Sequence, residues 1–476
     1  MPIQKKTKIV ATLGPATDDK KILKQMILEG VNVFRINFSH ADYEGVKKKV
    51  SMIRKLGDEL GTSVAILADL QGPKLRVGIM KDEVVVSPGD KISFCTGAEF
   101  EGTAKKVYMN YDNFPKDVKA GERVLLDDGK LMFEVLSTDG KKEVKTKVIQ
   151  GGPLRSRKGV NLPNTNISLP ALTEKDKEDA IFAVSLEVDW IALSFVRHAE
   201  DLKELQALIE AHSEYKIPII AKIEKPEAVA NIEKIVAYCD GLMVARGDLG
   251  VEVPAAEVPL IQKELVLTAK RARIPVIIAT QMMETMITSL TPTRAEVNDV
   301  ANSVMDGADA VMLSGETSVG KYPVEVIKVM ADICKNVENS DLIHVPQEPP
   351  HVRTNRYITK SICYHAALMA NEIKATAICT LTNSGYTAFQ ISAWRPDAHI
   401  LVYTSNKRIL SRLNLLWGVK SFYYDKFVST DETVDDVNRI AHEQGFVEKG
   451  DYLINLAAMP IVDKGMVNTL RVSQVN

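Results

Sequence analysis

The fold of this chain is decided by three stretches: PIIAKIE (218–224), GLMVARGD (241–248) and PVIIATQM (275–282). Each is a short apolar run that stops abruptly at polar residues. Such runs are typical of strands in a parallel sheet that is covered on both faces. Because charges at the end of a buried strand do not stabilise it, the polar residues predict a functional site.

Runs of the same kind lie on both sides of these three, at 7–14, 31–39, 63–70, 189–195 and 310–316. The segments between them have apolar residues at helical spacing, at 18–29, 42–60, 174–186, 198–213, 226–237, 256–272, 294–306 and 323–338. Eight strands that alternate with helices predict a closed (β/α)8 TIM barrel with its site at the C-terminal strand ends. An open doubly wound sheet is the alternative, and it also binds ligands at carboxyl ends.

Residues 75–167 break this pattern, because apolar and polar residues alternate there and Gly-containing turns recur. We expect a small β-barrel lid domain inserted after the third strand. After the Pro-rich segment 345–354, alternating strands and helices predict a smaller C-terminal α/β domain. The expected barrel domain has two parts, residues 1–72 and 168–345. The lid is expected at 73–167, and an effector or oligomerisation domain at 346–476.

The composition of the 476 residues, 45% apolar and 26% charged, is ordinary for a soluble globular protein. The formal charge of −2 makes neither nucleic acid nor an anionic membrane surface an expected partner. No apolar run approaches the roughly 18 residues of a membrane helix, and the N-terminal segment lacks the apolar core of a secretory signal. The five cysteines form no CxxC pair. We therefore expect a cytoplasmic protein without disulfides.

The polar residues after the central strands predict a metal site. Glu224 and Asp248 follow neighbouring strands, and paired carboxylates are what Mg²⁺ or Mn²⁺ takes from a protein. Lys222 stands two residues before Glu224, so both side chains point to the same side of the strand. A structural ion pair is the alternative interpretation of Lys222. Three more cations, Arg35, Arg76 and Lys158, lie near the predicted mouth, which favours phosphoryl transfer.

Seven motifs carry a resemblance to a known family: RINFSH (35–40), DLQGPK (69–74), KGVNLP (158–163), IIAKIEKPEAV (219–229), MVARGDLGVEVP (243–254), IIATQMMETM (277–286) and PTRAEVNDVANSVMDGADAVMLSGET (292–317). With them the chain resembles the pyruvate kinase family, essentially from residue 5 to its end. Members transfer the phosphoryl group of phosphoenolpyruvate to ADP, giving pyruvate and ATP in the final step of glycolysis. The resemblance is densest over 189–330.

The resemblance implies roles for individual residues. Glu224 and Asp248 match the magnesium ligands, and Lys222 matches the lysine that stabilises the transferring phosphoryl group. Substrate contacts are implied for Arg35, Lys222, Gly247, Asp248 and Thr280, of which Lys222, Thr280 and Arg35 are the catalytic candidates. Nucleotide contacts are implied for Asn37, Phe38, Ser39, His40, Arg76 and Lys158. A threonine hydroxyl is a poor acid, so the proton donor to the enolate stays open.

Many family members also bind potassium. Asn37, Ser39, Asp69 and Leu70 match the positions that hold K⁺ in them. Where potassium-requiring members carry Glu, this chain carries Lys74, as potassium-independent members do. The hypothesis is that the Lys74 ammonium supplies the charge of the missing ion.

The C-terminal segment TNSGYTA (382–388) resembles the family's sugar-phosphate loop, with a phosphate nest expected from Thr382, Ser384, Gly385 and Thr387. An ordinary strand-to-helix turn is the alternative. A phosphorylated allosteric effector is expected there. Its identity stays open, because the closing segment 457–472 lacks the PxGxxGxTN pattern of many fructose-bisphosphate-activated relatives. Relatives are usually homotetramers.

Two other functions compete with this one. The first is a different metal-dependent barrel enzyme that acts on pyruvate-like acids, against which the inserted lid with Arg76 and Lys158 argues. The second is a non-catalytic paralogue that only binds metabolites. Loss of Lys222, Glu224 or Asp248 would be expected for it, and the chain retains all three.

Overall fold

The computed structural model describes residues 5–81, 84–163, 165–340, 356–426, 429–459 and 465–475. All eight predicted strands are present and close into one parallel barrel, in the order β1-β16-β15-β14-β13-β12-β3-β2. Their bounds are β1 Lys8–Thr12, β2 Val33–Asn37, β3 Ala65–Asp69, β12 Trp190–Leu193, β13 Ile219–Ile223, β14 Gly241–Ala245, β15 Val276–Ala279 and β16 Ala310–Leu313. The predicted TIM barrel is therefore confirmed, and the open sheet is excluded.

Helices lie around the barrel as the apolar periodicity predicts. They are α1 Lys20–Leu28, α2 Tyr43–Leu60, α4 Glu174–Ser185, α5 Ala199–His212, α6 Pro226–Ala230, α7 Ile232–Ile235, α8 Arg246–Glu252, α9 Val258–Ala272, α10 Arg294–Asp306, α11 Gly315–Ser318 and α12 Pro323–Glu338. The segment predicted as one helix at 226–237 is thus two short helices. The expected strand 241–248 ends at Ala245, so Asp248 lies in the first turn of a helix.

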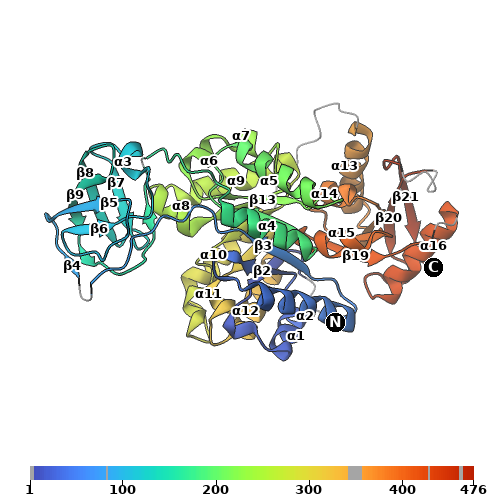
Figure 1. The fold of residues 1–476 in the computed structure, drawn as a ribbon. Coiled ribbons are helices and arrows are strands. Elements are labelled where there is room, and N and C mark those ends of the chain that lie inside the picture. The colour runs from blue at the N-terminus through green and yellow to red at the C-terminus, as the bar shows by residue number, and fades with distance from the viewer. Residues whose placement is uncertain are drawn as a thin grey trace.

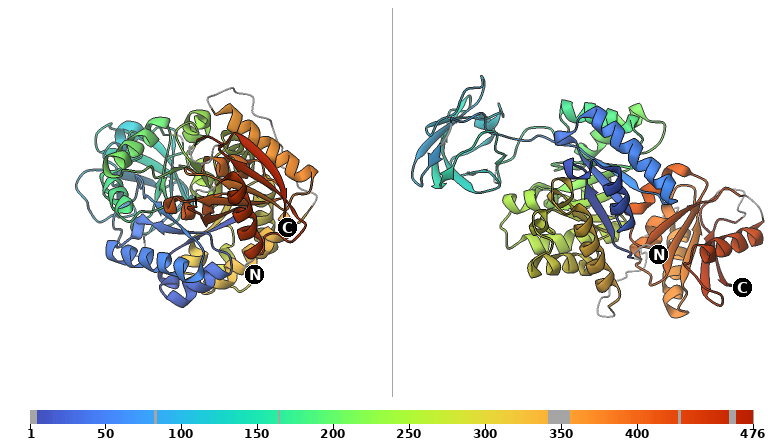
Figure 2. Two further views of the ribbon diagram at one scale, coloured as in Figure 1. Left: turned by 90° about the vertical axis from the view of Figure 1, so that its right-hand side faces the viewer. Right: turned by 90° about the horizontal axis from the view of Figure 1, so that it is seen from below.

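The inside of the barrel is filled by apolar side chains from alternate strand positions, such as Val10, Ile220 and Met243. At one end this cluster is continued by two residues of the C-terminal domain, Leu415 and Phe389. Phe389 lies against Trp190 of β12, with 6.3 Å between ring centroids. The C-terminal domain therefore packs on one end of the barrel, and the strands' C-terminal ends face the lid (Figures 1 and 2).

The inserted lid lies at the far left of Figure 1, across the barrel from the C-terminal domain. Its elements are β4 Val85–Val86, β5 Lys91–Cys95, β6 Lys106–Tyr108, α3 Phe114–Asp117, β7 Arg123–Leu126, β8 Leu131–Thr138, β9 Glu143–Gln150, β10 Gly152–Pro153 and β11 Val160–Asn161. Six of these strands form one curled sheet, in the order β11-β7-β8-β9-β5-β6. Isolated bridges pair Arg76 with Gly159, next to β11, and Val77 with Met109, next to β6. Residues 76–77 therefore connect the two edge strands of this sheet.

Two connecting segments hinge the lid to the barrel, and both are anchored. Gly72 has φ +71°, and a side chain there would meet Phe195 at 2.8 Å, so glycine is required. Its N–H donates to buried Asp176 at 3.0 Å. On the return segment, the Arg197 guanidinium donates to the carbonyls of Ile167 and Leu169.

The C-terminal domain is an α/β layer, shown in orange to red in Figure 2. Its elements are α13 Tyr357–Glu372, β17 Ala377–Leu381, α14 Tyr386–Ala393, β18 His399–Thr404, α15 Lys407–Arg412, η4 Leu413–Leu415, β19 Val419–Tyr423, α16 Thr430–Glu443, β20 Tyr452–Ala457 and β21 Thr469–Gln474. The sheet order is β19-β18-β17-β20-β21, and β21, which was not predicted, runs antiparallel. The Pro-rich segment 345–354 and part of 457–472 lie outside the described residues. Among the helices that are described, none is long and apolar enough to cross a membrane.

Candidate active site

Lys222 is the centre of a buried polar cluster at the C-terminal strand ends. Its Nζ lies 3.1 Å from Glu224 Oε1 and 3.2 Å from Asp69 Oδ1. It also donates a hydrogen bond of 2.6 Å to Ser194 Oγ. The side chain of Lys222 is 11% exposed and those of both carboxylates 1%. Interactions in such a low-dielectric site are strong, so the ammonium is held in one place.

Arg35 adds a second cation to this cluster. Its Nε donates to Asp69 Oδ2 at 2.6 Å, and its Nη1 donates to Thr12 Oγ1 at 3.1 Å. Burial alone would raise the pKa of Asp69, but Lys222 and Arg35 outweigh it and hold that pKa below its ordinary value. Burial alone would lower the pKa of Lys222, but Asp69 and Glu224 outweigh it and raise that pKa. Both groups are therefore charged at neutral pH.

Glu224 and Asp248 have the chemistry of a divalent-metal site. Burial raises the pKa of Glu224 against the attraction of Lys222, and the Asp248 carboxylate raises it further. A buried carboxylate beside a second carboxylate gains from a cation that both can share, so the pair fits Mg²⁺ or Mn²⁺. The described residues contain no group of three or more His, Cys, Asp or Glu that could hold a metal. A cation here would complete its shell with substrate oxygens and water.

Thr280 fixes the start of α8, the helix that carries Asp248. Its Oγ1 accepts a hydrogen bond from Gly247 N at 2.7 Å and donates one to Ala279 O at 2.6 Å. Thr280 has φ +71° and Gln281 has φ +55°, a left-handed conformation that costs on the order of 1–3 kcal/mol for such residues. This strain is typical of a functional site, and sequence patterns give no sign of it.

Two residues that the sequence analysis did not select complete the site. Ser194 follows β12, accepts the hydrogen bond of Lys222 and donates one of 2.7 Å to Leu70 O. Phe195 has φ +54°, and its N–H donates to Glu224 Oε2 at 2.7 Å. Both belong to the apolar run 189–195, so only their position at a strand end could have indicated them.

Arg246 follows β14 two residues before Asp248, but the helical turn directs its side chain elsewhere. Its guanidinium makes a bidentate pair with Asp299 of α10, at 2.6 and 2.7 Å, and donates to Thr280 O at 2.8 Å. It therefore braces the strand end from outside the cluster. Planar bidentate pairing of this kind is specific to arginine.

The cations expected from the lid are not beside Lys222 in this structure. Lys158 Nζ pairs with Asp127 Oδ1 of the lid itself at 2.9 Å. Arg76 Nη1 donates to Arg157 O at 3.2 Å. Lys74 is exposed, and it lines a small cavity between lid and barrel together with Asp248. Of these three cations, only Lys74 lines a cavity together with a predicted metal ligand.

The stretch that follows β2 turns through a short 3-10 helix, Phe38–His40. Asn37 Oδ1 caps this helix by accepting from Ser39 N at 3.1 Å. The Phe38 side chain is buried and packs edge-to-face on Phe182, with 6.4 Å between centroids. Only its backbone can therefore face a ligand. The side chain of His40 lies outside the described part of the chain.

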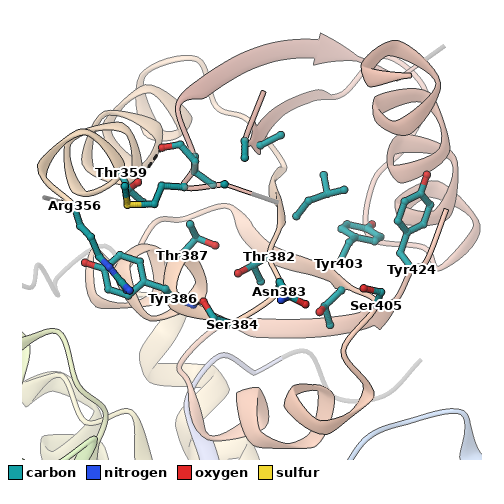
Figure 3. Close-up of a pocket in the computed structure, with 17 residues that line it drawn as sticks. Arg356, Thr359, Thr382, Asn383, Ser384, Tyr386, Thr387, Tyr403, Ser405 and Tyr424 are labelled. Atoms are coloured by element: carbon teal, nitrogen blue, oxygen red, sulfur yellow. Dashed lines mark hydrogen bonds between the residues drawn. The ribbon is translucent and has the colours of Figure 1, made fainter. Parts of the chain in front are cut away.

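The predicted effector loop borders a cavity of about 360 Å³ in the C-terminal domain (Figure 3). Thr382, Ser384 and Thr387 line it, together with Arg356 at its edge. Gly385 has φ +83° and donates from its N–H to Thr382 Oγ1 at 3.0 Å, which closes the turn before α14. Hydroxyls and a tight glycine turn beside a cavity have the chemistry of a phosphate nest.

Two family descriptions and a solved structure match this chain. The family description "Pyruvate kinase, barrel domain" matches residues 4–327, and "Pyruvate kinase, alpha/beta domain" matches residues 360–473. The crystal structure of a pyruvate kinase from Cryptosporidium parvum superposes with a TM-score of 0.92 at 33% identity, covering 99% of this chain and 97% of that one.

Curated relatives extend over the whole length. Pyruvate kinase 2 of Synechocystis sp. is 43% identical over 96% of this chain and 77% of its own length. The pyruvate kinase of Geobacillus stearothermophilus is 42% identical over 100% and 81%. That of Corynebacterium glutamicum is 42% identical over 99% and 98%. The family descriptions match both domains, and the relatives match nearly the whole chain. The chain therefore belongs to the pyruvate kinase family.

Proposed function

We propose that this protein transfers the phosphoryl group of phosphoenolpyruvate to ADP. The P–O bond of phosphoenolpyruvate breaks, a bond to the terminal oxygen of ADP forms, and the enolate left behind takes up one proton at carbon to give pyruvate. The observation that carries the proposal is the buried Lys222 ammonium, held between Asp69 and Glu224. A fixed cation beside a transferring phosphoryl group lowers the barrier without reorganising during the reaction.

Glu224 and Asp248 are the residues that would hold Mg²⁺ or Mn²⁺. When bound, the cation supplies neutralisation of phosphoryl oxygens. Lys222 and Arg35 orient the same phosphoryl group, and Asp69, which pairs with both cations, holds them in place. Thr280 contributes by holding Gly247 N and hence the start of α8. We assign to Gly247, Asp248 and Thr280 contacts with the rest of the substrate.

We assign nucleotide binding to the lid and to the turn after β2. Arg76, Lys158 and the stretch 37–40 would contact the ADP phosphates and ribose. For this, Lys158 exchanges its ion pair with Asp127 for a phosphate oxygen. This pair is partly exposed, and a dianionic ligand offers Lys158 more negative charge than the single Asp127 carboxylate does, so it can replace that partner. Lid closure then excludes water and favours transfer over hydrolysis.

Three further assignments follow family expectation and local chemistry. Lys74, at the cavity beside Asp248, takes the place of the potassium ion that Asn37, Ser39, Asp69 and Leu70 would otherwise hold. The turn 382–388 binds a phosphorylated allosteric effector. The protein acts as a homotetramer in the cytoplasm.

A coupled assay tests the proposed reaction. Purified protein is given phosphoenolpyruvate, ADP and Mg²⁺, and pyruvate is followed through lactate dehydrogenase. We expect pyruvate formation that needs both ADP and a divalent cation, with one ATP per pyruvate. Pyruvate formed without ADP would instead identify a lyase or phosphatase. Binding of phosphoenolpyruvate without turnover would identify a non-catalytic paralogue.

A further inference from the structure

One carboxylate oxygen joins three separate parts of the molecule at the active-site end of the barrel. Glu252 is the last residue of α8, and its side chain is buried. Its Oε1 accepts from Lys225 Nζ at 2.7 Å and from Asn161 Nδ2 at 2.9 Å. Lys225 belongs to the loop after β13, and Asn161 belongs to β11 of the lid.

The barrel side of this contact lies directly behind the predicted metal ligands. Lys225 follows Glu224 in the chain, and Glu252 follows Asp248 by one helical turn on the same face of α8. The Lys225 and Glu252 side chains are 8% and 1% exposed. A buried pair of this kind has a strongly defined geometry, because losing either partner leaves an uncompensated charge in the interior. The pair therefore fixes the spacing between both carboxylate-bearing segments.

The lid side of the contact lies near the hinge. Asn161 is three residues from Lys158. The segment that returns from the lid to the barrel is held by hydrogen bonds from Arg197 to the carbonyls of Ile167 and Leu169. A hydrogen bond so close to the hinge sets the angle of the whole lid, because a small shift there is amplified at the lid tip. The other oxygen of Glu252 is buried without a hydrogen-bond partner among the described residues. Within the described part of the chain, these two donors alone orient the carboxylate.

We propose that Glu252 is a positioning residue, which places the lid relative to the metal-binding carboxylates through Asn161. The inference rests on the proposed function. Glu252 acts through Lys225 and α8 on one side and through Asn161 on the other. Glu252 Oε1 then sets both the angle of the lid and the spacing between Glu224 and Asp248. Lys158 of the lid therefore reaches the nucleotide only when these two carboxylates are correctly spaced.

The first test separates the lid contact from the rest. Asn161→Ala removes only the hydrogen bond from the lid to the charged Glu252 carboxylate. This variant should raise KM for ADP about tenfold. KM for phosphoenolpyruvate should stay within about twofold of wild type. The matched control is Gln150→Ala, which removes a lid amide that donates only to Lys130 O within the lid. The control should behave as wild type.

The second readout does not depend on turnover. Hydrogen exchange of the backbone amides at 158–169 should be faster in Asn161→Ala than in wild type and in Gln150→Ala. Unchanged exchange together with an unchanged KM for ADP would overturn the proposal. If the wild type itself does not form pyruvate from phosphoenolpyruvate and ADP, the proposed function fails, and the exchange result alone then decides whether Asn161 holds the lid.

The barrel side needs a variant that keeps the fold. Glu252→Gln combined with Lys225→Met removes both buried charges, a change that proteins often tolerate. This double variant should raise the Mg²⁺ concentration for half-maximal activity about tenfold, whereas Asn161→Ala should leave it unchanged. A double variant with the wild-type Mg²⁺ requirement would contradict the link to the metal ligands.

Discussion

The Lys222 ammonium lies 3.2 Å from Asp69 Oδ1, although their strands are not neighbours. Lys222 comes from β13 and Asp69 from β3, and β12 runs between them. Ser194, which follows β12, accepts a hydrogen bond from the same ammonium. Groups from three adjacent strands therefore converge on one nitrogen, and the position of the site's central charge depends on the order of these strands in the barrel.

The first prediction concerns that nitrogen. Lys222→Met removes the cation that would face the transferring phosphoryl group, and we expect kcat to fall by about 10²- to 10³-fold. Ser194→Ala keeps the charge but loses its 2.6 Å acceptor, so kcat should fall by about tenfold. Steady-state kinetics check both.

Folding must be followed in the same variants, because Lys222→Met leaves Asp69 and Glu224 less compensated. We expect a lower Tm with an unchanged circular dichroism spectrum, since breaking a buried pair costs about 3–5 kcal/mol. Near-normal kcat in a folded Lys222→Met variant would remove Lys222 from the mechanism.

The second prediction concerns the metal pair. Glu224→Gln and Asp248→Asn each remove one negative ligand, so each should raise the Mg²⁺ concentration for half-maximal activity by at least about tenfold. Glu316→Gln is a matched control, because Glu316 is also a buried glutamate at a strand end but accepts only from Met283 N and Ser314 N. An equal rise in all three variants would point to general loss of structure.

The third prediction concerns monovalent cations. If Lys74 supplies the charge of a bound potassium ion, the wild type should keep its activity when K⁺ is replaced by tetramethylammonium. Lys74→Glu should then lose at least about tenfold in activity without K⁺ and recover with it. Lys91→Glu, the same change on an exposed lid strand, should not. Collapse of wild-type activity without K⁺ would contradict the role of Lys74.

The fourth prediction concerns stability and pH. Lys270 is buried between barrel and C-terminal domain, where it donates to Asp309 Oδ2 at 3.0 Å and Arg395 pairs with the same carboxylate. Burial, together with Arg395, lowers the pKa of Lys270 to about 7. Above that pH the unfolded chain binds more protons than the folded one. The free energy of unfolding should therefore rise from pH 7 towards pH 9, by at most about 1.4 kcal/mol per pH unit.

Urea unfolding at pH 7, 8 and 9 checks this slope. Lys270→Met should flatten it, while Lys263→Met, at a half-exposed lysine of the same helix, should leave it unchanged. Lys5, whose pKa burial lowers to about 8, is present in all three proteins, so only the difference between them reports on Lys270. Equal slopes in wild type and Lys270→Met would contradict the prediction.

The apolar runs alone sufficed to predict eight strands, the inserted lid and the C-terminal domain, because strand and helix periodicity is a local property of the chain. The same runs placed Glu224 and Asp248 at strand ends. The antiparallel β21 was missed because Thr469–Gln474 is half-polar and owes its strand form to pairing with β20.

What the tertiary structure alone decided is which polar groups meet. Arg246 and Asp248 are two residues apart, yet the turn into α8 sends the first to Asp299 and leaves the second beside the site. Asn161 and Glu252 are 91 residues apart and share a hydrogen bond. Periodicity reports which face of an element is buried, but contacts between elements depend on barrel closure and lid angle. For that reason the sequence determined the fold and indicated the candidate metal ligands, and the structure determined how those residues are held.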